Sequence, residues 1–447
     1  RWVNVDEGPH LMDAALVLDG AIPFVDFHSR QPLYVYVIAG FLKLFGTNYL
    51  VGRLSDVIFS LLTGLIVFLL AKALFDEQVG LLSAAVYWLL PLELLLSTVV
   101  KTEPLVTFLT CASFYSVVRY LRFGSKSWLI TAGIIAAMAF YVRESSLIIP
   151  PTVLIVLLVM CKWRVWQAAK NFGFFLAGYV AVVALVMGFY SRYLGSNLIL
   201  TSGLSPFGLL LLSIGRLTDL VEIPRKSVED PFFVYSSTVW HPWSSSVFVQ
   251  YLRDAVYLHS FLLLGVLFSA VIFLDQFIHK RKEVGTTHRV APVLLYGWIC
   301  FLFLAYCYRF VTQAFFIDYF REFLPPLVII FAAWVCSSIP SLGNEGRIEK
   351  LIFGGASLSA ILFVAQSHYK DQFGFGHHSS LTIAVFALLY FAGKWESATR
   401  RVVFASVIVA LLSLIVAGRY EPLKPYLSGA VPSVIMIALI YALTWLL

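Results

Sequence analysis

Residues 50–74 read LVGRLSDVIFSLLTGLIVFLLAKAL, a nearly continuous run of apolar side chains. A helix of this length rises far enough to cross a hydrocarbon layer of about 30 Å. The whole chain has the same character, because 60% of its 447 residues are hydrophobic and only 13% are charged, against roughly 25% in soluble domains. A transmembrane β-barrel is excluded because its strands would alternate polar and apolar residues, and these apolar runs do not alternate. The sequence therefore predicts an all-α, multi-pass integral membrane protein.

Apolar windows of similar length recur along the chain, separated by short joints that carry charge, proline or glycine. Joints rich in Lys and Arg alternate with joints that contain few, and the positive-inside rule assigns the rich ones to the cytoplasm. The first residues of the chain and the joint before Glu103 then face outward. We expect about 13 spans, at about 50–74, 79–99, 103–121, 127–143, 146–163, 170–193, 256–279, 289–309, 314–338, 349–368, 379–394, 401–418 and 428–447.

The formal net charge of +7 comes from Lys and Arg dispersed over the joints rather than gathered in one basic helix. Positive-inside placement explains this pattern, so no nucleic-acid partner is expected. The five Cys residues fall inside apolar windows without zinc-ligand spacing, and no Gly-rich nucleotide loop is found. The numbering starts at Arg1 rather than at methionine, which leaves open a further transmembrane helix or signal segment before it.

Two short helices and a long loop are expected on the outer face. PHLMDAALVLDG (9–20) starts with Pro, ends with Gly and has an apolar stripe, so it should lie flat at the membrane surface. QPLYVYVIAGFLKLFG (31–46) is similar but too short to cross. We divide the chain into an outer, catalytic loop with interfacial helices (1–49), an N-terminal transmembrane bundle (50–194), an outer loop of the length of a lid (195–255) and a C-terminal transmembrane bundle (256–447).

Carboxylates stand at the outer ends of two expected helices. Asp6 and Glu7 precede Pro9, and Glu103 follows Lys101 at the turn before another span. Either position suits a helix cap, because a carboxylate complements the helix dipole. Both positions fall on the same side of the membrane, where apolar neighbours raise the affinity of a carboxylate for protons and cations. The pattern therefore also suits a general base or a metal ligand, with capping as the alternative.

Arg321 lies in a stretch that otherwise has the composition of an apolar span. A charge inside a span is costly unless it is paired or solvated, which favours a functional role. With the Tyr319 hydroxyl as a second donor, its planar guanidinium suits a phosphate. A local ion pair with Asp318 or Glu322 is the structural alternative. YVRESS (141–146) contains a second outer arginine beside a carboxylate, which is a weaker signal.

The order of these residues resembles a known family. DEGPHLMDAALVLDGAIPFVDFHSRQPLYVYVIAGFLKLFG (6–46) is similar to the first outer loop of GT-C membrane glycosyltransferases of the dolichyl-phosphate-mannose protein mannosyltransferase and aminoarabinose transferase group. In that group an Asp-Glu pair opens an amphipathic helix, and a DG-x-x-P-(Y/F)-x-DF turn leads to a PPLYYY-like helix with an LFG stop. KTEPLVTFL (101–109) and YFREFLPPLVII (319–330) resemble later segments of the family. Gln31 replaces the first proline of the usual pair, and Pro9 and His10 stand where relatives often carry aromatic or small residues.

The resemblance implies a GT-C fold and an inverting glycosyltransferase. Such an enzyme moves a sugar from a polyprenyl-phosphate donor to an acceptor hydroxyl at the extracytoplasmic face of a membrane, here expected to be a prokaryotic cell membrane. Asp6 would be the general base for that hydroxyl, Glu7 would orient the acceptor or the helix, and Glu103 would hold the acceptor or a divalent cation. No nucleotide cofactor is implied, and both metal dependence and the choice among protein, lipid and glycan acceptors stay open.

On the donor side, the resemblance implies that four residues stabilise the leaving phosphate. These are Arg321, Tyr319, Arg53 and Lys101. A lipid phosphate is an activated leaving group, so the enzyme needs a base on one face of the sugar and positive charge on the other. A transporter or flippase of lipid-linked sugars is the main alternative, and it would place ionisable residues at mid-membrane depth. A scaffold subunit whose carboxylates only cap helices would leave Arg321 unexplained.

Overall fold

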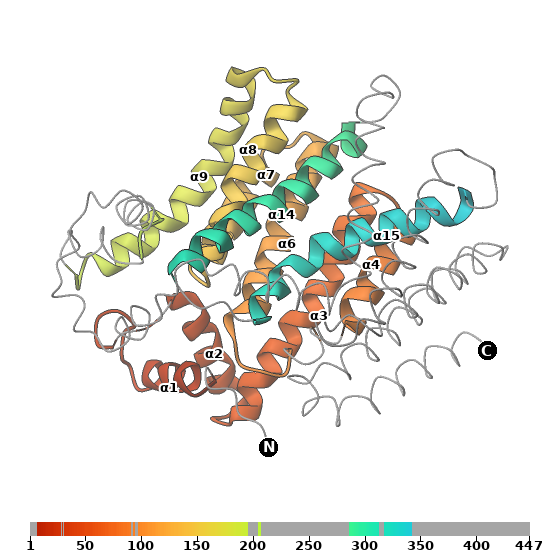
Figure 1. Ribbon diagram of the computed structural model, residues 1–447. Coiled ribbons are helices and arrows are strands. Elements are labelled where there is room, and N and C mark those ends of the chain that lie inside the picture. Colours follow the sequence, from red (N-terminus) through yellow and green to blue (C-terminus); the bar gives the residue numbers. More distant parts are fainter. Residues whose placement is uncertain are drawn as a thin grey trace, which may run out of the picture. The chain divides into compact units, whose positions relative to one another are not determined.

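The computed structural model describes residues 7–27, 29, 31–90, 93, 97–194, 204–206, 286–312 and 317–341. The regular secondary structure in these ranges is helical (Figure 1), which confirms the predicted all-α class. Three of the described helices are long and apolar enough to cross a membrane: α3 (Tyr49–Leu74), α6 (Thr102–Phe123) and α9 (Val165–Tyr190). The count of about 13 spans stays a prediction. The spans predicted at 256–279 and after 341, and 195–255 apart from 204–206, lie outside the described residues.

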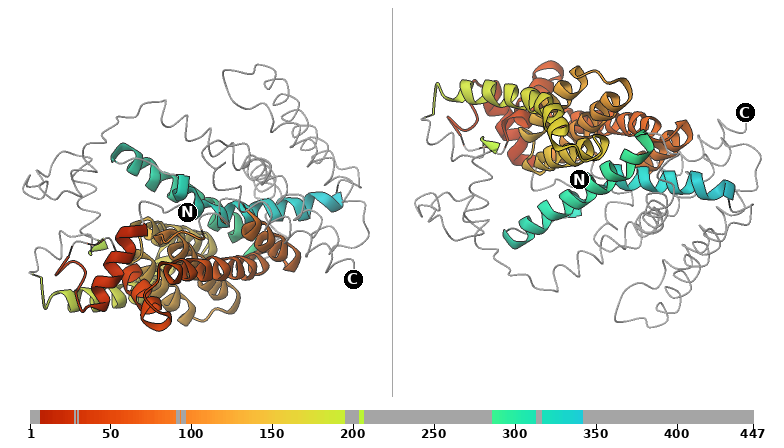
Figure 2. Two further views of the ribbon diagram at one scale, coloured as in Figure 1. Left: turned by 90° about the horizontal axis from the view of Figure 1, so that it is seen from below. Right: turned by 90° about the horizontal axis from the view of Figure 1, so that it is seen from above.

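The site described below belongs to one compact unit, within Arg1–Ile66, Ser97–Ser246 and Val290–Glu322. In this unit, α6 packs against α7 (Ser127–Phe140) and α8 (Ile149–Met160), and α7 packs along α9 (Figure 2). Phe114 of α6 also contacts Trp298 of α14 (Thr286–Thr312), with the ring centroids 4.7 Å apart. Because most of its residues are buried, α6 forms the centre of the unit.

Two glycines allow α7 and α9 to approach closely. Gly133 faces the backbone of Phe175, and Gly178 faces the backbone of Ile130. A Cβ atom at either glycine would collide with the opposing carbonyl oxygen. Small residues at such crossings let helix backbones touch, which is how helices commonly associate in membranes.

The two short helices that were predicted from the sequence between residues 9 and 46 are present. They are α1 (Glu7–Leu18), with Pro9 in its first turn, and α2 (Pro32–Phe45), and the two pack side by side (Figure 1). Gly20 and Gly46 follow these helices with φ of 95° and 98°, a region of the backbone that favours glycine. Their predicted position at the membrane surface stays a prediction.

Hydrogen bonds within and beside the DGAIPFVDF turn (19–27) hold the chain between these helices. The Asp26 carboxylate accepts a hydrogen bond from the backbone N–H of Ile22 at 2.7 Å. The Ser29 hydroxyl donates to Asp13 of α1 at 2.8 Å. This turn thereby returns the chain to α1 before α2 begins.

A second compact unit, within Val67–Leu96, Val247–Arg289 and Phe323–Leu447, contains α4 (Glu77–Leu89) and α15 (Leu324–Ser341), which pack against each other. α4 is shorter than the span predicted at 79–99. Leu90 is extended, with ψ of 129°, because the proline that follows it disfavours the α conformation.

Two other predicted spans start with a 3₁₀ segment instead of an α-helix. η1 (Glu144–Ile148) precedes α8 in the span predicted at 146–163, and η3 (Ile317–Phe323) precedes α15 in the span predicted at 314–338. Each α-helix has two consecutive prolines in its first turn, where a residue without an N–H donor is tolerated.

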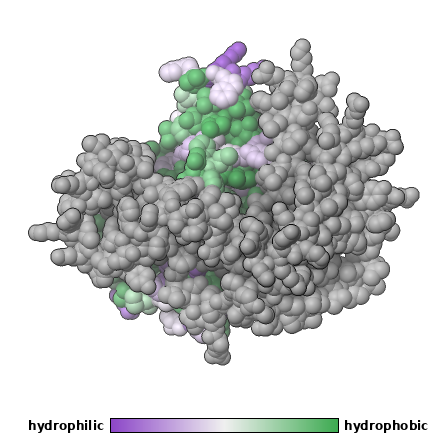
Figure 3. All heavy atoms as spheres, viewed as in Figure 1, coloured by the Kyte–Doolittle hydropathy of each residue, from purple (hydrophilic) through white to green (hydrophobic). Residues whose placement is uncertain are grey.

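The joint 162–170 is one of those rich in Lys and Arg, and it carries exposed aromatic and basic side chains. Trp163 and Trp166 are 66% and 84% exposed, and Lys162 and Arg164 lie beside them. In Figure 3 the apolar surface at the top of the view ends in polar residues. Aromatic and basic side chains together are typical of the membrane–water interface.

Candidate functional site

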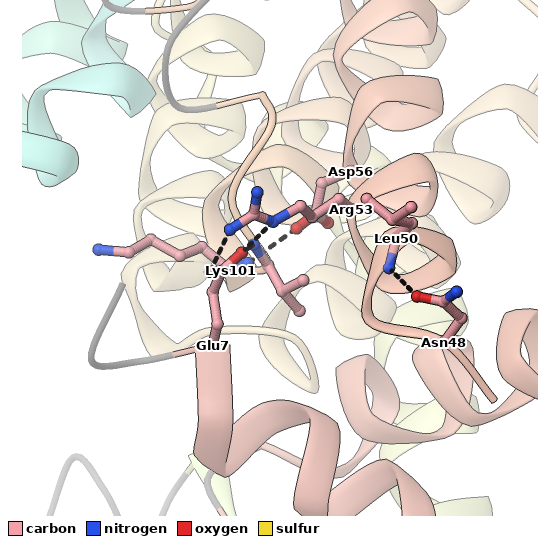
Figure 4. A network of polar contacts seen from close by, with 7 residues as sticks. Glu7, Asn48, Leu50, Arg53, Asp56 and Lys101 are labelled. Atoms are coloured by element: carbon pink, nitrogen blue, oxygen red, sulfur yellow. Dashed lines mark hydrogen bonds and ion pairs between the residues drawn. The ribbon is translucent and has the colours of Figure 1, made fainter. Parts of the chain in front are cut away.

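The backbone just before α6 is held by two carboxylates (Figure 4). Glu7 accepts a hydrogen bond from the N–H of Val100 at 3.0 Å, and Asp56 accepts one from the N–H of Lys101 at 2.8 Å. Lys101 is the N-cap residue of α6, and Val100 precedes it. N–H groups at the start of a helix have no acceptor within the helix, so they need partners from elsewhere. The two carboxylates therefore stabilise the turn from which Lys101 and Glu103 project.

Glu7 also forms an ion pair with Arg53, near the start of α3. The Nε and Nη2 atoms of Arg53 donate to the two carboxylate oxygens at 2.8 Å and 2.7 Å. Glu7 is buried, whereas the Arg53 side chain is 24% exposed. This fork-to-carboxylate geometry is the most directional form of the pair. It joins the first residue of α1 to α3.

Asp56 lies on α3 and is fully buried. Besides the Lys101 amide, its Oδ2 atom accepts a hydrogen bond from the Tyr34 hydroxyl of α2 at 3.1 Å. Burial, with the Asp56 charge as a second cause, raises the pKa of Tyr34 well above its ordinary value. The phenol therefore stays protonated and acts as the donor.

Arg143, in the turn after α7, lies between two buried carboxylates. It forms an ion pair with Glu103 of α6, and its Nε atom is 3.3 Å from Glu322 of η3. Glu322 also accepts a hydrogen bond from Tyr306 of α14 at 2.8 Å. The positive charge of Lys101 also acts on Glu103. Burying an ionised side chain is costly unless it is paired with an opposite charge. Glu103, Arg143 and Glu322 are paired in this way.

Arg321 is completely buried at the end of η3. Its positive charge lowers the pKa of the Tyr34 hydroxyl, whereas the charges of Asp56 and Glu103 raise it. The local partner considered for Arg321, Glu322, contacts Arg143 and Tyr306.

We call eight of these residues the charged cluster: Glu7, Arg53, Asp56, Lys101, Glu103, Arg143, Arg321 and Glu322. Five of them were predicted as site residues from the sequence. Asp6 lies outside the described residues, and Tyr319 lies in η3. Chemically, the cluster places buried positive and negative side chains at the ends of helices, where they can neutralise a phosphate and orient a hydroxyl.

Three members of the charged cluster were not predicted. Asp56 had the same signal as Arg321, a charge inside an apolar span. Arg143 was noted only as a weak candidate, and its partners come from distant parts of the sequence. Glu322 was considered only as a neighbour of Arg321.

The question of a metal ion was left open by the sequence. Within the described ranges, no three or more His, Cys, Asp or Glu side chains are grouped so that they could hold a metal ion. Glu103 and Glu322 meet at Arg143, whose positive charge occupies the space between them.

Comparison with known proteins gives two kinds of similarity. Residues 28–191, which contain α2 to α9, match the family model of dolichyl-phosphate-mannose-protein mannosyltransferases. The fold is similar to that of ArnT from Cupriavidus metallidurans bound to undecaprenyl phosphate, with a TM-score of 0.50 and 14% sequence identity over 94% of this chain and 74% of ArnT. Among curated protein sequences, none matches this chain.

Two further structures give weaker similarity. ArnT in the apo state has a TM-score of 0.49 and 16% identity over the same shares of the two chains, 94% and 74%. The Archaeoglobus fulgidus oligosaccharyltransferase complex with Zn and sulfate has a TM-score of 0.47 and 15% identity over 90% of this chain and 48% of its own.

The family match covers α3, the start of α6 and the turn after α7. These three segments carry five residues of the charged cluster: Arg53, Asp56, Lys101, Glu103 and Arg143. The similarity to ArnT covers most of the chain and shows a shared fold. The chain therefore shares the fold of the membrane enzyme ArnT, and its residues 28–191 match the family model of dolichyl-phosphate-mannose-protein mannosyltransferases.

Proposed function

We propose that the protein transfers a sugar from a polyprenyl-phosphate donor to an acceptor hydroxyl, with inversion at the anomeric carbon, at the extracytoplasmic face of a prokaryotic cell membrane. The observation that carries this proposal is the charged cluster. Its buried cations and carboxylates gather at the start of α6 and at the ends of neighbouring segments. Groups of this kind are costly in a membrane protein and mark functional sites. The undecaprenyl phosphate bound to ArnT supports the choice of carrier.

The reaction needs a base on one side of the sugar. We assign this role to Asp6, the residue before α1. Its carboxylate takes the proton of the acceptor hydroxyl, and the oxygen forms a bond to the anomeric carbon from the face opposite the phosphate. The bond between the anomeric carbon and the phosphate oxygen breaks, and its electron pair stays on the phosphate.

The leaving phosphate needs positive charge. We assign Lys101 and Arg321 to this role, with the Tyr319 hydroxyl as an additional donor. Arg53 contributes through its ion pair with Glu7, which holds the start of α1 beside α3. Glu103 is the second acidic member, and we assign it to holding the acceptor.

The test is transfer by purified protein in nanodiscs. The protein is supplied with radiolabelled polyprenyl phosphates that carry different sugars, and with membrane extract as the source of acceptor. We expect label to move to an acceptor with the wild type and not with Asp6→Asn, which keeps the shape of the side chain but not its basicity. The anomeric configuration of the product, measured by NMR, tests inversion. Translocation of the labelled lipid across vesicles without transfer would replace this proposal with a flippase.

A further inference from the structure

Asp56 connects three helices through one buried carboxylate. It lies on α3, it accepts a hydrogen bond from Tyr34 of α2, and it accepts another from the backbone N–H of Lys101, the N-cap residue of α6. The two bonds to Oδ2 measure 3.1 Å and 2.8 Å, and Asp56 has no exposed surface. Figure 4 shows Asp56 beside the Lys101 backbone.

Helix packing alone does not explain a carboxylate at this position, because burying it costs free energy. α3 is apolar enough to span a membrane, and an aliphatic side chain would satisfy its packing without desolvating a charge. The carboxylate is compensated by two donors and by the nearby charge of Arg321. This arrangement is specific for the backbone of one residue, Lys101.

The N–H of Lys101 fixes the direction of two side chains of the charged cluster. Lys101 has an extended backbone, with φ of −149° and ψ of 158°, and its own side chain forms no capping hydrogen bond. Glu7 holds the preceding amide, that of Val100, and Asp56 holds the amide of Lys101 itself. The orientation of Lys101 and of Glu103, in the first turn of α6, therefore depends on Asp56.

We propose that Asp56 is a positioning residue for sugar transfer: by fixing the Lys101 backbone it holds the Lys101 ammonium and the Glu103 carboxylate in their working geometry. The inference rests on the proposed function, in which Lys101 stabilises the leaving phosphate. We assign Asp56 no contact with substrate, because its carboxylate already accepts hydrogen bonds from the Tyr34 hydroxyl and the Lys101 N–H. A small displacement of a catalytic group lowers the reaction rate strongly. Loss of the hydrogen bond between the Lys101 N–H and Asp56 should therefore lower the rate of transfer more than it lowers the stability of the fold.

Two substitutions at this position separate the hydrogen-bond acceptor from the charge. Asp56→Asn keeps an oxygen that accepts the Lys101 N–H, and Asp56→Leu keeps the volume without an acceptor. We expect Asp56→Leu to lower kcat/KM for the donor about 100-fold, and Asp56→Asn to retain most of it. Thr63→Val, on the same helix, is the matched control, because within the part of the chain that the structure describes the buried Thr63 hydroxyl donates to the Phe59 carbonyl of α3 itself.

A cycle with Lys101 distinguishes positioning from a role in folding. Lys101→Met should lower kcat/KM for the donor in the wild type and change it little in the Asp56→Leu background, because there the ammonium is already misplaced. The losses in thermal stability of the two substitutions should be additive. The proposal is overturned if Lys101→Met lowers kcat/KM by the same factor in both backgrounds. It is also overturned if Asp56→Leu keeps full activity per folded molecule.

Binding of undecaprenyl phosphate without sugar provides a readout that is independent of transfer. We expect its affinity to fall in Asp56→Leu and in Lys101→Met, and to be kept in Asp56→Asn and Thr63→Val. Equal affinity in Asp56→Leu and the wild type would contradict the role of Asp56 alone. A wild type that neither binds this carrier nor transfers sugar would instead contradict the proposed function.

Discussion

The guanidinium of Arg143 forms an ion pair with the Glu103 carboxylate, and both side chains are buried. Arg143 follows α7, whereas Glu103 opens α6, so this pair joins the turn after one helix to the start of another. The Arg143 guanidinium also reaches Glu322 of η3. One cation thus compensates two carboxylates from distant parts of the sequence.

Replacing this cation should be severely destabilising. Arg143→Met removes the charge while keeping much of the side-chain volume, and it leaves Glu103 and Glu322 facing each other. Breaking a buried pair in this way costs about 3–5 kcal/mol. Arg122→Met, at an exposed position near the end of α6, should change the free energy of unfolding in detergent micelles very little. Similar unfolding of the two variants would show that the Arg143 pairs contribute no stability.

The ion pair between Glu7 and Arg53 should appear as coupling in a double-mutant cycle. Because the two side chains meet through two hydrogen bonds, Glu7→Gln and Arg53→Met should not be additive. We expect an interaction energy of about 1–3 kcal/mol from unfolding of the single and double variants. The amide oxygen introduced by Glu7→Gln can still accept the Val100 N–H, so the cycle isolates the contact with Arg53. Additive effects would mean that the pair is fully screened by solvent.

The close approach of α7 and α9 predicts a sharp difference between glycines of one helix. Gly178→Ala places a methyl group against the backbone of Ile130 and should destabilise the protein by about 1–3 kcal/mol. Gly173→Ala is the control, because a Cβ atom there meets nothing within 4 Å. It should be neutral, or stabilising by up to about 1 kcal/mol through helix propensity. Thermal unfolding followed by helix content measures both, and equal effects would contradict the packing.

Two buried tyrosines should respond differently to loss of the hydroxyl. Tyr306 donates to Glu322, whereas the Tyr141 hydroxyl has no hydrogen-bond partner in the described part of the chain. Tyr306→Phe should cost about 1.5–3 kcal/mol, the value of a hydrogen bond to a charged group, while Tyr141→Phe should be neutral or stabilising. Thermal unfolding of the two variants in the same detergent measures the difference. A greater loss in Tyr141→Phe would reveal a partner for its hydroxyl.

Much of the helical pattern follows from local sequence, because length, hydrophobicity and the punctuation by Pro and Gly are local properties. α3, α6 and α2 lie close to their predicted positions for this reason. Pro91 indicated that α4 ends early, but the predicted span followed the hydrophobicity of residues 79–99 instead. Apolar composition alone does not distinguish one long helix from a shorter one that a proline ends.

The charged cluster was predicted in part for a similar reason. Glu103 and Arg321 have a local signal, a charge near the end of an apolar run. Their neighbours depend on the tertiary structure, because Arg143 is beside Glu144 in the sequence but pairs with Glu103 and Glu322 in space. A charge in a span shows that a partner is needed, and only the packing of the helices shows which one it is.

The amides of Val100 and Lys101 stand where helices ordinarily fray. Each donates its proton to a buried carboxylate, from Glu7 and from Asp56. Exchange of these two amide protons with heavy water should therefore be as slow as exchange in the middle of α6. A helix start that does not open can present the same face to each arriving lipid, so the enzyme need not rebuild its site between turnovers.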